Sequence, residues 1–293
     1  MLHPLLMIDY ASRGAARSLQ FRLPVLRTPS HNYRKQVDKP GSCSVVWISE
    51  NSTTVLKAPL AFHLDGCDDA VTMEYRSCEK ESVELLEREK EIYMHLGEHK
   101  GILPCFQSTD SGLVFPYLKN GNLRHFLCNS AELIVFSMRL DWIQTALRSI
   151  QYIHSKGVLQ ADISARNFLV ADDLSLCLCD FSGSMIGARK NLVRPETRYE
   201  KFEGTEPVDI SVRTEIFAVG SLIYEISTGK RPYDELEDGE VEHLFRQGVF
   251  PTTSSLYFGG IINNCWLGHY KTVAEILHAG PFTEGTPCLP KSG

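Results

Sequence analysis

Apolar residues come in short, strand-like runs over the first part of the chain. Residues 44–58 are rich in Val and Thr and predict two strands joined by a polar turn. Apolar runs at 102–106 and 112–118 predict further strands. Residues 60–78 mix polar signals and predict a loop or an insertion.

A helix is expected over residues 79–96, and one of its faces carries a single acid among apolar side chains. Steps of four, three and four residues place on that face Leu85, Glu89, Ile92 and Leu96. An apolar face packs inward, so Glu89 should point into the protein. The same pattern assigns Arg88 and Glu91 to a solvated polar face.

In the second part of the chain the periodicity becomes helical. Residues 140–155 predict a helix with Gly157 just beyond its end, and residues 214–228 predict a strongly apolar helix closed by Gly229. A strand–loop–strand pattern at 158–181 lies between these helices. A strand-rich part with one helix, followed by a helix-rich part, predicts an α+β protein of two lobes with a ligand cleft between them.

Composition narrows the class of protein. The 293 residues are 43% hydrophobic and 23% charged, which is ordinary for a globular protein. The net charge of −6 argues against a nucleic-acid partner. No stretch approaches the roughly 20 apolar residues of a membrane span. Nine cysteines form neither a disulfide framework nor a paired zinc arrangement, so we expect a reducing, intracellular and cytoplasmic location.

The first 35 residues form a basic arm, with a single acid, Asp9, against Arg13, Arg17, Arg22, Arg27 and Arg34. We expect residues 1–35 to be disordered. An Arg-rich, acid-poor start is also typical of an organelle transit peptide, and that alternative stays open. Prolines within residues 23–29 interrupt a continuous amphipathic helix.

Two short polar elements carry the candidate chemistry. In the sequence DISARN, Asp162 precedes Asn167 by five positions on a loop between two strands. Such an Asp can accept a proton from a hydroxyl, and such an Asn can hold a divalent ion. In CDFSGS, Asp180 ends an apolar strand, where a carboxylate can be presented to Mg²⁺.

Together these elements resemble the catalytic loop and the metal-binding loop of eukaryotic-type protein kinases. Asp180 follows Asp162 by 18 positions, a separation similar to that of the family. The sequences TEIFAVGSLIYEISTGKRPY and INNCWLGHY resemble later kinase helices, and the resemblance covers residues 36–278. The sequence as a whole most resembles divergent kinase-like proteins of filamentous fungi.

The resemblance implies a fold and a set of roles. The fold is a small β-rich N-terminal lobe with one main helix and a larger helical C-terminal lobe, over residues 36–280, followed by a tail at 281–293. Asp162 would be the catalytic base, with Asn167 and Asp180 as Mg²⁺ ligands. Lys57 in VLKAP would hold the phosphates of ATP, paired with Glu89.

The resemblance also assigns the nucleotide pocket. GLVFPYLKNGNL is similar to the segment that links the two kinase lobes, with Phe115 at the back of the pocket. Adenine would be held by backbone groups of Pro116, through its carbonyl only, and of Leu118. Further pocket residues implied are Gly41, Val46 and Leu169.

Several positions depart from the kinase pattern. The loop KPGSCSVV keeps one glycine of three, which implies a stiffer cover over the phosphates. Gln160-Ala161 stands where the family has His-Arg, and that Arg binds a phosphate on the activation segment (residues 180–203). We therefore expect activity without phosphorylation of this segment. Ser182 replaces a Gly, Glu215 replaces the Asp that caps the catalytic loop, and Glu203 is the candidate for the acid that ends the segment.

Three functions remain open from the sequence. The first is an ATP- and Mg²⁺-dependent kinase that phosphorylates a protein, with Ser/Thr favoured by frequency, although Ser164-Ala165-Arg166 resembles the tyrosine-kinase form. The second is a pseudokinase that binds nucleotide or partners without catalysis. The third is a small-molecule phosphotransferase of the related fold. The sequence assigns neither substrate nor oligomeric state.

Overall fold

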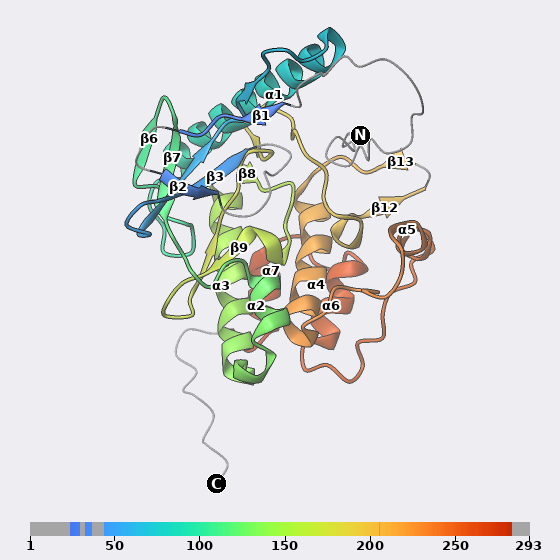
Figure 1. The fold of residues 1–293 in the computed structure, drawn as a ribbon. Helices are drawn as coiled ribbons and strands as arrows, with labels where there is room; N and C mark the ends of the chain where they lie inside the picture. Colours follow the sequence, from blue (N-terminus) through green and yellow to red (C-terminus); the bar gives the residue numbers. More distant parts are fainter. Residues whose placement is uncertain (1–23, 30–32, 37–43, 205, 283–293) are drawn as a thin grey trace.

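The computed structural model describes residues 24–29, 33–36, 44–204 and 206–282 of the chain. These residues form a β-rich lobe with one long helix and a larger helical lobe beside it (Figure 1). The α+β, bilobal fold implied by the kinase resemblance is therefore confirmed. Among the described residues, the helices are too short or too polar to span a bilayer.

The N-terminal lobe is built on one antiparallel sheet of five strands, in the order β2-β3-β4-β7-β6. The strands are β2 Tyr33–Gln36, β3 Val45–Ser49, β4 Thr54–Ala58, β6 Gln107–Thr109 and β7 Gly112–Pro116. The strands predicted within 44–58 and 112–118 are confirmed. The strand predicted at 102–106 is wrong, because Ile102 forms only an isolated bridge to Leu178 and the pairing with β7 begins at Gln107.

Helix α1 spans Asp69–Leu96 and is the one long helix of this lobe. The loop predicted over 60–78 is therefore wrong for its last ten positions. Asp68 caps the helix by accepting a hydrogen bond from the backbone N–H of Ala70 at 2.8 Å. Beside the extra turns lies a two-stranded antiparallel pair, in which β1 Val25–Leu26 pairs with β5 Phe62–His63.

That pair of strands contacts α1 through polar and aromatic groups. The backbone N–H of Phe62 donates to Glu79 Oε1 at 2.7 Å, and the Phe62 ring meets Tyr75 edge-on with centroids 4.8 Å apart. Strand β1 lies within the basic arm of residues 1–35, and strand β2 begins in it at Tyr33. Most of that arm lies outside the described residues, as does nearly all of the tail at 281–293, so the expectations for both stay predictions.

The C-terminal lobe is helical, and α3 and α4 run through its middle (Figure 1). Its helices are α2 Leu123–Asn129, α3 Phe136–Ser155, α4 Val212–Thr228, α5 Asp238–Arg246, α6 Gly259–Trp266 and α7 Val273–Ala279. The helices predicted at 140–155 and 214–228 are confirmed. Ser211 caps the start of α4, and Gly229 ends it with a left-handed φ of 78°.

Three short antiparallel pairs of strands follow α3 in the sequence. They comprise β8 Val158–Leu159 with β11 Met185–Ile186, β9 Phe168–Val170 with β10 Leu176–Leu178, and β12 Phe202–Glu203 with β13 Glu206–Pro207. The described residues also contain the short 3₁₀ helices η2 Ala131–Leu133, η3 Ala165–Asn167 and η4 Thr197–Tyr199.

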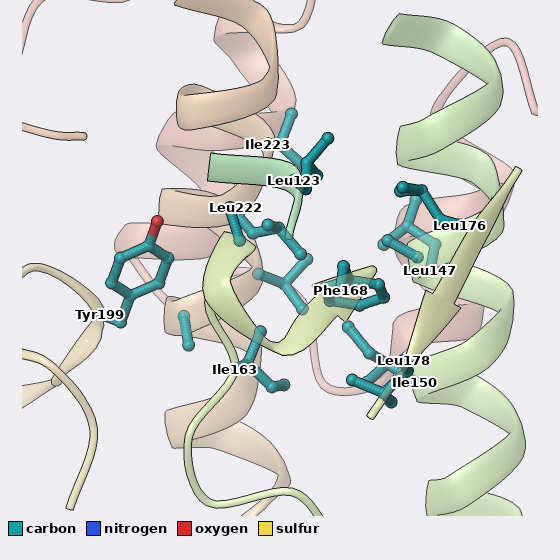
Figure 2. Packing of buried hydrophobic residues seen from close by; sticks show 14 of the residues in the cluster. Leu123, Leu147, Ile150, Ile163, Phe168, Leu176, Leu178, Tyr199, Leu222 and Ile223 are labelled. Carbon is teal, nitrogen blue, oxygen red and sulfur yellow. The ribbon is translucent and has the colours of Figure 1, made fainter. Parts of the chain in front are cut away.

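The core of the C-terminal lobe holds the loop that carries Asp162 and Asn167. Ile163 directly follows Asp162 and Phe168 directly follows Asn167, and both are buried in the cluster that Figure 2 shows, which also contains Leu123, Leu147 and Ile150. Apolar burial of this kind stabilises by roughly 25 cal/mol per Å² of area removed from water. The polar residues Asp162 and Asn167 are therefore held in position by the buried side chains next to them in the loop.

Candidate active site

Lys57 lies at the centre of the cleft and pairs with two carboxylates. It stands on β4 opposite Val46 of β3, and its side chain is 11% exposed. Its Nζ lies 2.6 Å from Oε2 of Glu89 on α1 and 2.7 Å from Oδ1 of Asp180, which follows β10. Three segments far apart in the sequence therefore meet at one ammonium group.

The two carboxylates stand in different surroundings. Glu89 is 1% exposed, and burial raises its pKa although Lys57 opposes the shift. Burial also acts to raise the pKa of Asp180, but Lys57 and the Ser182 hydroxyl outweigh it, so the pKa of Asp180 is lowered. Burial alone would lower the pKa of Lys57, yet Asp180 and Glu89 together raise it. All of these shifts except that of Glu89 favour the charged form.

The segment after Asp180 is fixed against α1. The backbone N–H of Phe181 donates to Glu89 Oε1 at 3.2 Å. The Phe181 ring is fully buried and meets Tyr93 edge-on at 5.3 Å between centroids, and Tyr93 in turn lies 5.2 Å from Phe115. These three rings pack against one another and connect α1, β7 and the segment after Asp180.

Asp162 and Asn167 lie together in the catalytic loop. Asn167 donates from Nδ2 to the Asp162 carbonyl at 2.7 Å and to Asp162 Oδ2 at 3.0 Å. The buried Oδ1 of Asp162 has no hydrogen-bond partner in the described part of the chain. Burial raises the pKa of Asp162 to about 6, against the opposing effects of Arg166 and Asn167. Oδ1 is therefore enclosed by protein, and a hydroxyl donor would meet the other part of the Asp162 side chain, which is 21% exposed.

Two of the departures from the kinase pattern are compensated structurally. Gln160 donates from Nε2 to the carbonyls of Asp180 at 2.7 Å and of Cys179 at 3.1 Å, so it joins the catalytic loop to the metal-binding loop. Glu215 accepts at Oε1 from the N–H of Ala161 at 2.7 Å, and its Oε2 meets His154 Nε2. Ala161 has a left-handed φ of 65°, so this hydrogen bond holds a backbone that is otherwise disfavoured.

The proposed magnesium ligands offer suitable atoms. The side chain of Asp180 is 46% exposed, and carboxylate and amide oxygens are the donors that Mg²⁺ prefers. The amide nitrogen of Asn167 is used by Asp162, which leaves its oxygen for a cation. Among the described residues no group of three or more His, Cys, Asp and Glu side chains could hold a metal ion. The donor set thus fits an ion that takes further ligands from phosphates and water.

The remaining residues assigned to the nucleotide pocket lie on β7, after it, and on β9. Phe115 is buried on β7, Pro116 ends that strand, and both Leu118 and Leu169 pack against the main core. The carbonyl of Leu118 accepts from the Gly121 N–H at 3.1 Å and keeps a second lone pair. Gly41 lies outside the described residues.

Two expectations about charged residues are wrong. Arg88 was assigned to the polar face of α1, yet it is 7% exposed and donates from Nη1 to the carbonyls of Ser184 and Lys190, each at 2.9 Å. Glu203 was the candidate to end the activation segment, yet it is exposed and pairs with Lys201 and Arg213 on the surface. The buried residues at this end are instead Arg198, Tyr199, Glu200 and Phe202.

Sequence reasoning also missed a cluster of arginines and glutamates beside the catalytic loop. Arg124 of α2 contacts both Glu196, at the end of the activation segment, and Glu225 of α4. Glu196 contacts Arg166 of the catalytic loop as well. Only charge complementarity could have indicated these pairs, because their partners lie 30 to 101 positions apart.

Comparison with known proteins gives one family. The family model described as "Protein tyrosine and serine/threonine kinase" matches residues 54–272. A putative serine/threonine-protein kinase/receptor of Acanthamoeba polyphaga mimivirus is 25% identical over 172 residues, 55% of this chain and 10% of that protein. A probable serine/threonine-protein kinase of Clostridium acetobutylicum is 26% identical over 127 residues, 42% of this chain and 19% of that protein.

A tyrosine-protein kinase of Homo sapiens is also similar, at 24% identity over 195 residues, which are 61% of this chain and 39% of that protein. The matched region thus spans well under half the length of each of these three relatives. Both serine/threonine and tyrosine kinases occur among the relatives at similar identity.

Proposed function

The chain belongs to the protein tyrosine and serine/threonine kinase family, and from that premise we propose that it is an active kinase that transfers the γ-phosphate of ATP to a protein hydroxyl. One observation carries the proposal. Lys57 contacts Glu89 and Asp180 at once, at 2.6 and 2.7 Å, so the groups required for the nucleotide phosphates are already assembled.

Nucleotide binding follows from this assembly. Adenine occupies the cleft beside Phe115, with backbone groups of Pro116 and Leu118 as its hydrogen-bond partners. Lys57, fixed by Glu89, binds the α- and β-phosphates. Asn167 and Asp180 hold Mg²⁺, which when bound neutralises charge on the phosphates.

Phosphotransfer then requires a base next to the acceptor. The hydroxyl oxygen of the substrate forms a bond to the γ-phosphorus as the bond from the β–γ bridging oxygen breaks, and ADP leaves. The hydroxyl proton passes to the Asp162 carboxylate, which is 21% exposed and whose Oδ2 accepts from Asn167. The protein contributes chiefly positioning and charge stabilisation.

The acceptor in this proposal is a serine or threonine of a protein. Serine/threonine kinases occur among the relatives beside tyrosine kinases, and the greater frequency of serine/threonine kinases among protein kinases in general favours this acceptor. A peptide array with matched Ser, Thr and Tyr acceptors tests the choice. Preferential labelling of the Tyr peptides would replace the proposed acceptor and leave the kinase assignment intact.

A reducing compartment suits the cysteines. The seven cysteines of the described residues are all free thiols, and we place the activity inside the cell, in the cytoplasm, on that ground. Fractionation of cells that express the full chain tests this location, and recovery in an organelle fraction would support the transit-peptide alternative.

A nucleotide-binding pseudokinase is the second candidate, and one observation favours it. Oδ1 of Asp180 already accepts from Ser182 Oγ at 2.8 Å as well as pairing with Lys57, so fewer lone pairs remain for a metal ion. The loop around Gly41, with one glycine of three, supports the same alternative.

The deciding measurement is Mg-ATP turnover by purified protein beside Asp162→Asn. We expect the variant to lose at least about 100-fold in kcat, because general-base catalysis contributes roughly 10²–10⁴-fold. Asp172→Asn is the matched control, since Asp172 is exposed and contacts only Lys119 at 3.4 Å. Equal background turnover by wild type and Asp162→Asn would refute the active kinase, and nucleotide-dependent thermal stabilisation would then support the pseudokinase.

A further inference from the structure

Glu196 joins three parts of the C-terminal lobe at the end of the activation segment. Its carboxylate accepts two hydrogen bonds from Arg124 Nη1, at 2.9 and 3.0 Å, and one contact from Arg166 Nε at 2.7 Å. Arg231, after α4, approaches it to 3.9 Å. Its side chain is 17% exposed, so these charges interact with little screening by water.

A second layer of contacts fixes Arg124. The guanidinium donates to Glu225 Oε1 at 2.7 Å and to Oε2 at 3.2 Å, and Glu225 is buried on α4. The hydroxyl of Tyr199 donates to the same Glu225 carboxylate. Arg124 is therefore held in place on α2 by Glu225 of α4, independently of its contact with Glu196.

The contact with Arg166 reaches the reacting groups. While Nε of Arg166 binds Glu196, its Nη2 lies 3.6 Å from Asp162 Oδ2. The guanidinium thus stands on the side of Oδ2 and leaves Oδ1 without a partner. Without Glu196, Arg166 would be free to move closer to Asp162 and pair with Oδ2 directly.

We propose that Glu196 is a positioning residue: a built-in carboxylate that locks the end of the activation segment onto α2 and keeps Arg166 to one side of Asp162. Ala161 stands where many kinases have an arginine that binds an added phosphate, so this chain lacks that attachment. The carboxylate of Glu196 supplies an attachment that needs no modification. The catalytic consequence rests on the proposed kinase function, whereas the locking of the segment does not.

The kinetic test compares Glu196→Gln, Glu196→Asp and Glu203→Gln, each treated with phosphatase before the assay. Glu203 is the matched control because it lies in the same segment, but it pairs with Lys201 and Arg213, each at 3.1 Å, away from the catalytic loop. We expect Glu196→Gln to lower kcat about 10- to 100-fold, since a misplacement of about 1 Å can cost 10²-fold. The KM for the peptide rises, the KM for ATP stays within about twofold, and Glu196→Asp recovers part of kcat.

Hydrogen exchange gives a readout that does not need activity. The amides of Tyr199 and Asn167 are bonded to the carbonyls of Glu196 and Ser164, at 2.8 and 3.1 Å, and report on the segment and on the catalytic loop. In Glu196→Gln both should exchange at least about tenfold faster than in wild type and Glu203→Gln, while amides of α3 stay protected. If wild-type protein proves inactive, this comparison alone decides the inference.

Two results would overturn the inference. One is Glu196→Gln behaving as Glu203→Gln does, in kcat where turnover is measurable and in exchange throughout. The other is a wild-type kinase that loses its activity on phosphatase treatment, because a built-in carboxylate would then be insufficient to hold the segment.

Discussion

One ammonium group balances two carboxylates at the centre of this molecule. Glu89 is buried to 1% exposure and depends on Lys57 for its charge partner, whereas Asp180 keeps almost half of its side chain exposed. The site therefore carries a net charge of about −1 before any cation is bound. That balance suits a group that must bind the phosphates of a nucleotide together with a divalent ion.

Replacing Lys57 by Met tests how much this balance contributes to the fold. The variant leaves the buried Glu89 carboxylate without a counter-charge, and breaking a buried pair in this way costs about 3–5 kcal/mol. Urea unfolding measures the loss. Adding Glu89→Gln to Lys57→Met should recover more than about 1 kcal/mol, because the uncompensated charge is removed.

Lys119→Met serves as the control for this prediction, because Lys119 is exposed and pairs with Asp172 at 3.4 Å. We expect it to change stability by less than about 1 kcal/mol. A Lys57→Met variant no less stable than Lys119→Met would show that Glu89 takes up a proton or finds water without cost.

Sequence periodicity predicts the burial of some single residues and not of others. The inward orientation of Glu89 was predictable because its helix buries one apolar face, and local periodicity decides which acid lies on it. Arg88, one position earlier, is buried for a reason that periodicity does not contain. Its partners are carbonyls of Ser184 and Lys190, about a hundred positions away in the chain.

The catalytic assignments for Lys57, Asp162, Asn167 and Asp180 were inferred from a resemblance, and their roles stay predictions. The structure pairs Lys57 with Asp180 and Asp162 with Asn167, and the side chain of Gln160 joins the two loops. The cluster around Glu196 had no sequence signal of comparable strength. An ion pair between distant positions has no characteristic spacing, so only the folded chain identifies it.

At the scale of elements, the errors fall where tertiary contacts replace local preference. The first turns of α1 lie in a stretch of mixed polarity. They lie near the antiparallel pair of β1 and β5, which contacts the helix through Phe62 and Tyr75, and the buried residues of the helix begin only at Ser82. Strand β6 is polar and exposed, and it exists because it pairs with β7 through a tight turn. The apolar Ile102 and Leu103 are buried without belonging to a strand.

Gly112 shows how closely two strands approach at the site. Its φ is +146°, and a Cβ added there would lie 2.1 Å from the carbonyl oxygen of Lys57. Gly112→Ala must therefore push β7 away from β4 next to the lysine, or distort the turn before β7. We expect a loss of about 2 kcal/mol or more in stability, and a higher KM for ATP.

Gly239→Ala is the matched control for Gly112→Ala. Gly239 lies in α5, and an added Cβ meets nothing within 4 Å. In a helix this change should stabilise by up to about 1 kcal/mol. If chemical unfolding gave Gly112→Ala the same stability as the wild type, the strands would have to be more compliant than this contact implies.

At the scale of the whole molecule, α1 is the main contact between the lobes. Beyond the pairs of Glu89, its Arg88 contacts two carbonyls of the activation segment, and Glu91 pairs with Arg189 at 2.6 Å. Near its end, His95 Nε2 meets the carbonyl of Lys156 at 2.7 Å. The helix therefore touches both the start and the middle of the activation segment and the end of α3.

Ligand binding at this junction should stabilise the whole chain. A nucleotide at about 100 times its Kd adds about 2.7 kcal/mol, which corresponds to roughly 5–10 °C in Tm for a chain of this size. We expect a thermal-shift assay to show this rise with Mg-ATP and a smaller one with ATP and excess EDTA. Asp180→Asn should abolish the difference between the two conditions, and a shift that ignores Mg²⁺ in the wild type would contradict the metal assignment.

Helix α1 is also a lever of unequal arms. Its end at Leu96 is tied to α3, where the Tyr152 hydroxyl donates to the Leu96 carbonyl. At about 1.5 Å per residue, Asp69 lies about 40 Å from that pivot and Glu89 only about 10 Å. A tilt of about 10° would sweep the first turn through about 7 Å and Glu89 through about 2 Å. The β1–β5 pair contacts the helix at Tyr75, about 30 Å from the pivot, so a force applied there is multiplied about threefold at the acid that holds Lys57.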